Sequence, residues 1–472
     1  NVVATGQRGS ADLSAYFMRR VASLLRERSA MGMIATNTIA QGDTREVGLE
    51  TLLAGGYGCP RAVASQKWPG DANLEVAIVW IWRGAWAGEH YLEGSAVNGI
   101  TPYLTVPGAT AGKPYRLAAN AGKSFQGSIV LGMGFVLEPE EAAALIARDA
   151  RNRDVLFPYL NGEDLNSRWD QSPSRWVINF HDWPLDRESA PEGYAGPVAA
   201  DFPECLRIVE EKVRPERQRR DSSGEFVLRR PLPDRYWHFG EKRPALYAAI
   251  SGMRRVLAVT RHQELWQVSL YPTQVVFSDA LVVIAVELDG FGLLQSSVGE
   301  EWVRALASTL ETRLRFTPSD CFETFPFPAE LASLESIADR YDAHRCAIMA
   351  GRREGLTATC NRMHSSDDST ADIAQLRALH VELDRAVADA YGWTDLDLGH
   401  DFHRTKQGIR FTMSERARLE VLARLLQLNR DRHAEEVAQG LHDKTTKPAA
   451  KKPRAKSKPA LAPPPAAPDL FT

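Results

Sequence analysis

The first hundred residues alternate between helix-like and strand-like patterns, and this alternation constrains the fold more than any other feature of the chain. Apolar residues recur at helical spacing over 11–26, and a second helical pattern at 44–54 ends at a glycine pair. Three short apolar stretches have the spacing of strands, at 31–35, 61–65 and 74–82. Such alternation predicts an α/β sheet layered with helices. Residues 1–106 are too few for a complete doubly wound domain, so we interpret them as the second half of a Rossmann-like sheet.

Beyond residue 106 the patterns change twice. Short strand-like segments with many Pro and Gly turns predict an α+β domain over 107–330. Helical periodicity dominates 331–437, with amphipathic stretches at 372–391 and 414–428, and Ser414 stands in the cap position of the second stretch. The last segment, 438–472, is Lys, Pro and Ala with little apolar bulk from Lys444 onward, so we expect it to be disordered.

The bulk composition excludes several classes of protein. The formal net charge of -3 over 472 residues excludes a uniformly basic nucleic-acid binder but not a locally basic face. No apolar run has the length of a membrane span. The five cysteines include no C-x-x-C pair, which argues against a zinc site and is typical of a reducing cytoplasm. The chain begins at Asn1 rather than Met, and we therefore expect it to be part of a longer protein.

Common catalytic signatures do not occur in the sequence. There is no H-E-x-x-H, no G-x-S-x-G and no complete P-loop. Asp201 with Glu210-x-Lys212 has a loose likeness to a nuclease metal site, but Glu-x-Lys is common by chance and no strand-borne Pro-Asp precedes it. No metal ligand or catalytic residue can be named from such motifs.

A set of long strings, spread over most of the chain, carries the most specific signal. The longest are MGMIATNTIAQGDTREVGL at 31–49, KWPGDANLEVAIVWI at 67–81 and RLRFTPSDCFETFPFP at 313–328. Others are FQGSIVLGMGF, FPYLNGEDLN, IVEEKVRPER, EGLTATCNRMH and LHVELDRAVADAYGW. In order and spacing these strings resemble the MmeI-like family of DNA adenine methyltransferases, which belong to type IIL restriction–modification systems and to related phage-defence systems. The resemblance extends to about residue 436.

The resemblance implies a methyltransferase domain, a DNA target-recognition domain and a helical C-terminal region, in this order. It also implies S-adenosyl-L-methionine as cofactor and double-stranded DNA as partner. Family members carry a glycine-containing cofactor loop and an Asn-Pro-Pro-aromatic motif that holds the flipped adenine, and this sequence has neither. The family order places both upstream of Gly9, so no catalytic residue is carried over. An upstream methyltransferase half or a nuclease domain is a further expected partner.

Two polar residues follow the strand expected at 31–35, at the end of a sheet where open α/β folds bind ligands. Thr36 and Asn37 are therefore candidates for lining the base pocket. The alternative is that Asn37 only caps the turn. Asp12 could bond a ligand amine, although a carboxylate is also favourable at a helix N-terminus for electrostatic reasons alone.

A basic stretch between Pro203 and Arg261 contains more Lys and Arg than Asp and Glu, and it includes the aromatic-rich run 236–239. Arginine can bind phosphates or read guanine in the major groove. A charge run alone favours a solvated face, but together with the resemblance it predicts DNA contact by this region. Counting two arginines of the 313–328 string, the candidates are Lys212, Arg214, Arg217, Arg219, Arg220, Arg229, Arg230, Arg254, Arg255, Arg313 and Arg315.

Two functional hypotheses are compatible with the sequence. In the first, the full-length protein transfers a methyl group from S-adenosylmethionine to adenine in a specific DNA sequence, and this chain is inactive alone. In the second, the chain is a DNA-recognition module without catalytic activity by itself. An in-frame Asn-Pro-Pro-aromatic upstream of Asn1 would support the first, and a genuine start at Asn1 the second.

Overall fold

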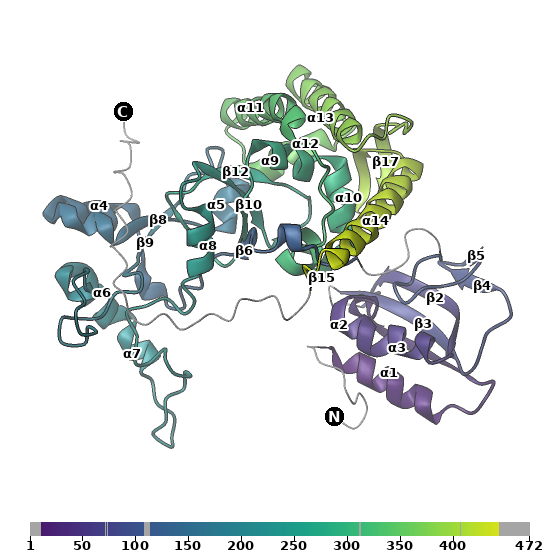
Figure 1. The fold of residues 1–472 in the computed structure, drawn as a ribbon, viewed down its shortest axis with the longest axis horizontal. Coiled ribbons are helices and arrows are strands. Elements are labelled where there is room, and N and C mark those ends of the chain that lie inside the picture. The colour runs from purple at the N-terminus through teal and green to yellow at the C-terminus, as the bar shows by residue number, and fades with distance from the viewer. Residues whose placement is uncertain are drawn as a thin grey trace.

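The structure is a computed structural model that describes residues 11–70, 72, 74–107, 114–310, 313–405 and 407–442. It shows a mixed α/β protein with several small sheets and a layer of long helices (Figure 1). The tail predicted from Lys444 onward and the start of the chain up to residue 10 lie outside the described residues.

Residues 11–107 form a sheet of five strands with helices beside it (Figure 1). The strand order is β1-β3-β2-β4-β5, with β3 antiparallel to both β1 and β2, and β4 parallel to β2. The three predicted strands and the first helix are confirmed, whereas the helix expected at 44–54 is interrupted by a π-helical turn, Glu46–Glu50. The elements are α1 Leu13–Leu24, β1 Ala30–Thr36, α2 Gly42–Arg45, α3 Thr51–Ala54, β2 Gly58–Lys67, β3 Glu75–Trp82, β4 His90–Leu92 and β5 Ser95–Val97.

One face of this sheet is packed and the other is partly open. Met31 and Ala35 of β1 are buried in the core that α1 covers. Gly32 and Ile34 point to the opposite face, because successive residues of a strand alternate. There Ile34 remains 57% exposed. The sheet therefore carries apolar surface on its second face at β1.

Helix α1 is amphipathic in an unexpected sense. Its buried residues are the small or unbranched Ala15, Met18 and Ala22, which let the helix lie close to the sheet. Its larger apolar side chains recur on the opposite side and point to solvent. Their exposed fractions are 70%, 63%, 44% and 67% for Leu13, Phe17, Val21 and Leu24.

The middle of the chain builds three further small sheets. Their orders are β12-β10-β14-β6, β13-β8-β9-β7 and β11-β16-β15. The elements are β6 Ser124–Gln126, β7 Val136–Leu137, α4 Pro139–Arg148, β8 Leu156–Leu160, α5 Gly162–Ser167, β9 Arg175–Ile178, α6 Pro203–Lys212, α7 Arg214–Arg217, α8 Pro244–Ile250, β10 Arg255–Thr260, β11 His262–Gln263, β12 Ser269–Pro272, β13 Val276–Phe277, β14 Leu281–Ile284, α9 Leu288–Gln295, α10 Ser297–Leu306, β15 Ser308–Leu310 and β16 Arg313–Arg315.

Long helices and one hairpin complete the described chain. The predicted helices at 372–391 and 414–428 are confirmed as α13 and α14, and the Ser414 side chain caps α14 by accepting from the Ala417 amide. One buried core contains residues from Leu257 to Leu383, so packing marks no boundary at residue 330 and the division there stays a prediction. The elements are α11 Glu335–Arg352, α12 Leu356–Met363, α13 Ala371–Ala390, β17 Asp401–Thr405, β18 Gly408–Thr412 and α14 Glu415–Ala438.

Two of the strings singled out in the sequence meet at the start of α12. A Cβ on Gly355 would lie 2.4 Å from the backbone of Ser167, at the end of α5. Glycine at position 355 is therefore required by close packing between the string at 354–364 and the string at 157–166. This contact ties the helical layer to the middle of the chain.

Helix α14 holds the segment that leaves the N-terminal sheet. The buried Asn429 side chain accepts from the Tyr115 amide at 2.8 Å and donates to the Tyr115 carbonyl at 2.8 Å and to the Thr324 carbonyl at 2.6 Å. About two helical turns later, Glu436 accepts from the amides of Ala118 and Ala119. One helix thus supplies hydrogen-bond partners to backbone groups of a segment more than 300 positions away.

Replacing Asn429 by Ala should destabilise the protein by about 2–4 kcal/mol, because backbone groups at Tyr115 and Thr324 would lose their buried partner. Chemical denaturation followed by tryptophan fluorescence measures this change. The matched control is Gln427→Ala on the exposed side of the same helix, which should change the free energy of unfolding by less than about 0.5 kcal/mol. Equal effects of the two substitutions would contradict the role given to Asn429.

Candidate nucleic-acid interface

The basic residues singled out in the sequence fall into three separate places. Seven lie on α6, α7 and the loop that follows, two stand at the start of β10, and two are on β16. Arg254 and Arg255 are exposed and lie at the start of β10. The residues that pair with β16 come after the other end of β10. A strand of six residues spans about 20 Å, so these groups cannot share one small patch.

A group of positively charged side chains surrounds the short strands β11 and β16. We call the set Arg261, His262, Arg313 and Arg315 the hairpin cluster. His262 stands opposite Arg315 in the antiparallel pair of β11 with β16. Sequence reasoning had singled out both β16 arginines but not Arg261 or His262, because their proximity depends on the pairing of strands about 50 residues apart.

Like charges face one another in the hairpin cluster. Burial and then the nearby Arg315 lower the pKa of Arg261, and Asp279 opposes this effect. Burial lowers the pKa of His262 first, and Arg261, Arg315 and Arg313 lower it further. The arginines disfavour protonation of one another and of His262, which indicates a positive electrostatic potential at the hairpin cluster. Such a potential favours binding of phosphate groups.

The hairpin cluster rests on a packed support. The Arg261 carbonyl accepts from the Phe316 amide at 2.9 Å, and its amide donates to the Ala280 carbonyl at 2.9 Å. Beneath it, Thr260 accepts from the Asn166 side chain at 3.3 Å. Residue 166 ends the string 157–166. Hydrogen bonds with Asn166, Ala280 and Phe316, all outside β10, therefore fix the backbone on which the cluster stands.

Arg217 has a structural environment. Its side chain is buried and donates to the carbonyls of Val130, Leu131 and His238. Burial lowers its pKa to about 10. We leave it out of the proposed DNA contacts because its donors already have partners. The aromatic run beside it is also buried and belongs to a core: Tyr236, Trp237, His238 and Phe239.

The other candidates on this part of the chain are exposed. Lys212 lies 3.9 Å from Glu141, and Arg214 lies 3.9 Å from Glu210 and over the ring of Tyr236. The remaining four belong to the loop after α7: Arg219, Arg220, Arg229 and Arg230.

The proposed base-pocket residues have local partners. Asn37 is buried and its amide donates to Ser65 at 3.0 Å and to Glu75 at 3.1 Å, which links the end of β1 to β2 and β3. Thr36 is exposed and its hydroxyl lies 2.6 Å from that of Thr38. Asp12 accepts from the Ser14 amide and caps α1. A base pocket at this position stays a prediction.

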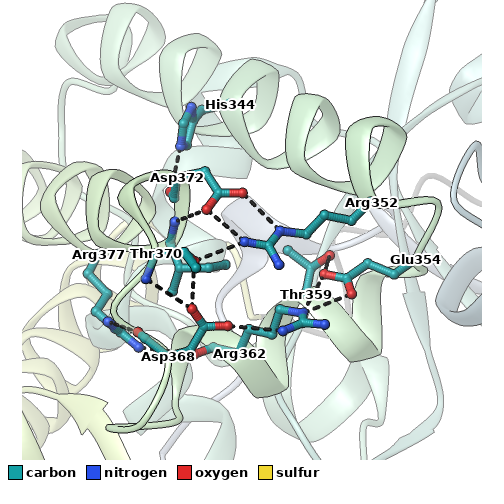
Figure 2. A network of polar contacts seen from close by, with 10 residues as sticks. His344, Arg352, Glu354, Thr359, Arg362, Asp368, Thr370, Asp372 and Arg377 are labelled. Carbon is teal, nitrogen blue, oxygen red and sulfur yellow. Dashed lines mark hydrogen bonds and ion pairs between the residues drawn. The ribbon is translucent and has the colours of Figure 1, made fainter.

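A contrasting arginine network lies in the helical layer (Figure 2). Arg352 forms a two-pronged contact with Asp372, at 2.9 and 2.8 Å, which holds the pKa of that carboxyl well below its usual range. Arg362 donates through one nitrogen to both carboxylate oxygens of Glu354 and through another to Asp368. Carboxylates neutralise these arginines, so their arrangement joins α11, α12 and α13 rather than offering charge to a ligand.

The described residues offer neither a metal site nor a membrane-spanning helix. No group of three or more His, Cys, Asp or Glu side chains there is arranged to hold a metal ion. Asp201 instead accepts from Arg187 at 2.7 Å, and Glu210 accepts from Tyr236 at 3.0 Å. None of the described helices combines the length and apolar character needed to cross a membrane.

Comparison with known proteins places the fold. No family model matches the chain, and no curated protein matches it. Among solved structures, the chain has the fold of a restriction–modification enzyme. That enzyme is the type IIL protein MmeI, solved in complex with DNA, with a TM-score of 0.68 and 17% identity. The match covers 92% of this chain and 54% of MmeI, so the chain spans about half the length of that protein.

A second solved structure, the type IIG restriction endonuclease BpuSI, matches much less well. It has a TM-score of 0.26 at 12% identity, over 82% of this chain and 51% of that protein. At this level of similarity it carries no argument about the fold.

Replacing Arg315 by Gln should raise the pKa of His262, because a like charge that disfavours the imidazolium is removed. Addition of a short DNA duplex to the unmodified protein should also raise this pKa if phosphates approach the hairpin cluster. NMR titration of the histidine ring measures both changes. Arg255→Gln, at the other end of β10, serves as control and should leave the pKa of His262 unchanged.

Proposed function

We propose that this chain is the sheet-completing and DNA-recognising part of a site-specific DNA adenine methyltransferase of a restriction–modification or phage-defence system. The observation that carries the proposal is the fold shared with MmeI over 92% of the chain. The hairpin cluster, in which His262 stands opposite Arg315 and positive charges face one another, is our candidate surface for DNA on the body of the protein. MmeI is solved in complex with DNA, and here we extend DNA binding to this chain as a proposal.

The N-terminal sheet supports the first half of the proposal. Within the described residues, β1 pairs with β3 alone and forms one edge of the sheet. An edge strand has free backbone donors and acceptors that can pair with a further strand. We propose that the cofactor-binding half of a Rossmann-like sheet adds at this edge. The exposed apolar stripe of α1 and the exposed Ile34 would then be covered in the same step.

The residues described here do not fit S-adenosylmethionine by themselves. The side chain nearest to the expected ligand edge, Asn37, is buried and bonded to Ser65 and Glu75. Neither a glycine-containing cofactor loop nor Asn-Pro-Pro occurs in the sequence. We therefore derive no chemical step within this chain, and the proposal assigns cofactor binding mainly to another part of the full-length protein.

The contribution of this chain to the reaction would be delivery of the substrate. An adenine must leave the duplex before its amine can be methylated, at a cost of about a few kcal/mol. Methyl transfer then depends on accurate positioning of the two reactants. A protein surface that fixes the duplex beside the pocket supplies both the register and part of the free energy for base flipping. The hairpin cluster is our candidate for this surface.

Sequence-specific recognition is the first testable consequence. The protein should select a preferred site from a random duplex library at a salt concentration that abolishes non-specific binding. The double substitution R261Q/R315Q should weaken that binding. Each lost base contact should cost about 1–3 kcal/mol of binding free energy. Each lost phosphate contact should reduce the slope of log affinity against log salt concentration by about 0.9. Fluorescence anisotropy over a salt series separates the two effects.

The control for this experiment is R151Q/R340Q, because both arginines are exposed and paired with carboxylates, Asp149 and Glu382. Unmodified protein that binds every duplex equally, with equal salt sensitivity, would contradict sequence recognition. Sequence preference without methyl transfer in the presence of S-adenosylmethionine and the complete upstream reading frame would favour the second hypothesis, a recognition module without catalytic activity.

The apolar stripe gives a second test. The double substitution F17S/L24S should change the free energy of unfolding of the chain by less than about 0.5 kcal/mol, because both side chains are exposed. The same change should abolish association with a separately produced cofactor-binding half, since large exposed apolar patches mark interaction sites. Size-exclusion chromatography measures the association. Arg20→Ser on an exposed position of α1 should leave it intact.

A further inference from the structure

The loop that follows α7 is a projecting arm with its own structure. We define the arm as residues 218–235, which extend away from the body of the protein in Figure 1. Most of its side chains are exposed, and Pro233 is its one buried residue. In this view the arm lies at the lower left and the N-terminal sheet at the lower right (Figure 1). Because the arm is so exposed, it contributes little to the stability of the core, and its arginines are available to a partner.

The base of the arm is fixed. Arg217, directly before it, is buried and donates to three backbone carbonyls, and Gln218 donates to the Pro233 carbonyl at 3.1 Å across the base. Trp237, two residues after it, donates to the Trp183 carbonyl at 3.0 Å. Both ends are therefore held by the core, and the arm emerges in a defined direction.

The tip of the arm is held by its own contacts. The Val227 amide donates to the Arg219 carbonyl at 3.0 Å, and the Asp221 amide donates to the Glu225 carbonyl at 2.9 Å. The Asp221 side chain accepts from the Ser223 amide at 2.8 Å and closes the turn. Because the turn is ordered in the free protein, less conformational entropy is lost when it binds a partner.

The charges of the arm are oriented but not neutralised. The guanidinium of Arg220 lies 4.1 Å from the centre of the Phe226 ring and donates to the Gly224 carbonyl. Contact with a ring orients a guanidinium without cancelling its charge, unlike an ion pair with a carboxylate. Among the described residues, no carboxylate lies within 4.0 Å of the guanidinium groups of Arg219, Arg220 or Arg229. Arg230 differs, because it lies 3.6 Å from Asp234.

We propose that the arm binds the phosphate backbone of the duplex beside the target site, through Arg219, Arg220 and Arg229. This inference rests on the proposed function, since it requires that the chain binds DNA. The arm would grip the backbone and extend the footprint of the protein, while the hairpin cluster stays on the body. Backbone contacts fix position and add affinity without reading sequence.

The test compares two triple variants of the same charge change. R219Q/R220Q/R229Q removes three arginines from the arm. The control, R148Q/R151Q/R207Q, removes three exposed arginines from the same part of the fold that are paired with Glu204, Asp149 and Glu211. Affinity for duplexes with and without the preferred site is measured between 50 and 200 mM salt, and hydroxyl-radical footprinting maps the protected backbone.

Three backbone contacts should add about 2.7 to the salt slope, at about 0.9 each. When salt is raised fourfold, the affinity of the unmodified protein should therefore fall about 40-fold more than that of the arm variant. Its footprint should be shorter at one end, and its ratio of specific to non-specific affinity should stay unchanged. The control variant should behave as the unmodified protein.

The outcomes separate the arm from the proposed function. If the arm and control variants have the same slope and footprint, the arm does not bind phosphates, even where the unmodified protein shows sequence preference. A loss of preference in the arm variant would also overturn the proposal, because the arm would then read bases. The salt slope of the arm variant could also be reduced in a protein that prefers no sequence. That result would support phosphate binding by the arm and contradict site-specific recognition.

Discussion

The hydrogen bonds between α14 and residues 115–119 fix how the chain passes from the N-terminal sheet into the rest of the protein. Asn429 and Glu436 satisfy four backbone groups of a segment more than 300 positions away in the sequence. Asn120, which follows directly, donates to the carbonyls of Phe322 and Phe325. The segment that leaves the N-terminal sheet thus enters the body through buried polar contacts on two sides. Because buried polar groups tolerate few alternative partners, this entry point has one geometry.

Local structure was predictable from the sequence wherever periodicity and caps decide it. The helices α1, α13 and α14 and the strands β1, β2 and β3 lie where hydrophobic spacing placed them, and Ser414 caps α14 as expected. The order of strands and the antiparallel direction of β3 depend on contacts between distant segments, which periodicity does not report. Spacing also located the apolar stripe of α1 without indicating that it faces solvent. The buried side of this helix consists of Ala15, Met18 and Ala22, which a search for large apolar residues overlooks.

The candidate site was predictable only in part, because arginine has four different environments in this fold. Arg217 is buried among carbonyls, Arg352 is neutralised by Asp372, and Arg315 faces other cations. Each of these environments is created by residues remote in the sequence, so a count of charges in a window cannot separate them. The arm shows a fourth case, in which Phe226 orients Arg220 without neutralising it. The fold thus places arginines of one sequence in environments that differ in burial and in the charge of their neighbours.

The two proposed DNA surfaces differ in rigidity, and this difference suggests different tasks. The hairpin cluster stands on paired strands over a packed core, where Thr260 and Phe316 are both buried. Side chains on such a support can be placed accurately enough to discriminate one base edge from another. The arm is fixed at its base but solvated along its length, which suits contacts that tolerate small displacements, as phosphate contacts do. Phosphate contacts at the arm would hold the duplex while the hairpin cluster contacts its bases. The open edge at β1 would attach the cofactor-binding half of the enzyme to the same body that recognises the DNA sequence.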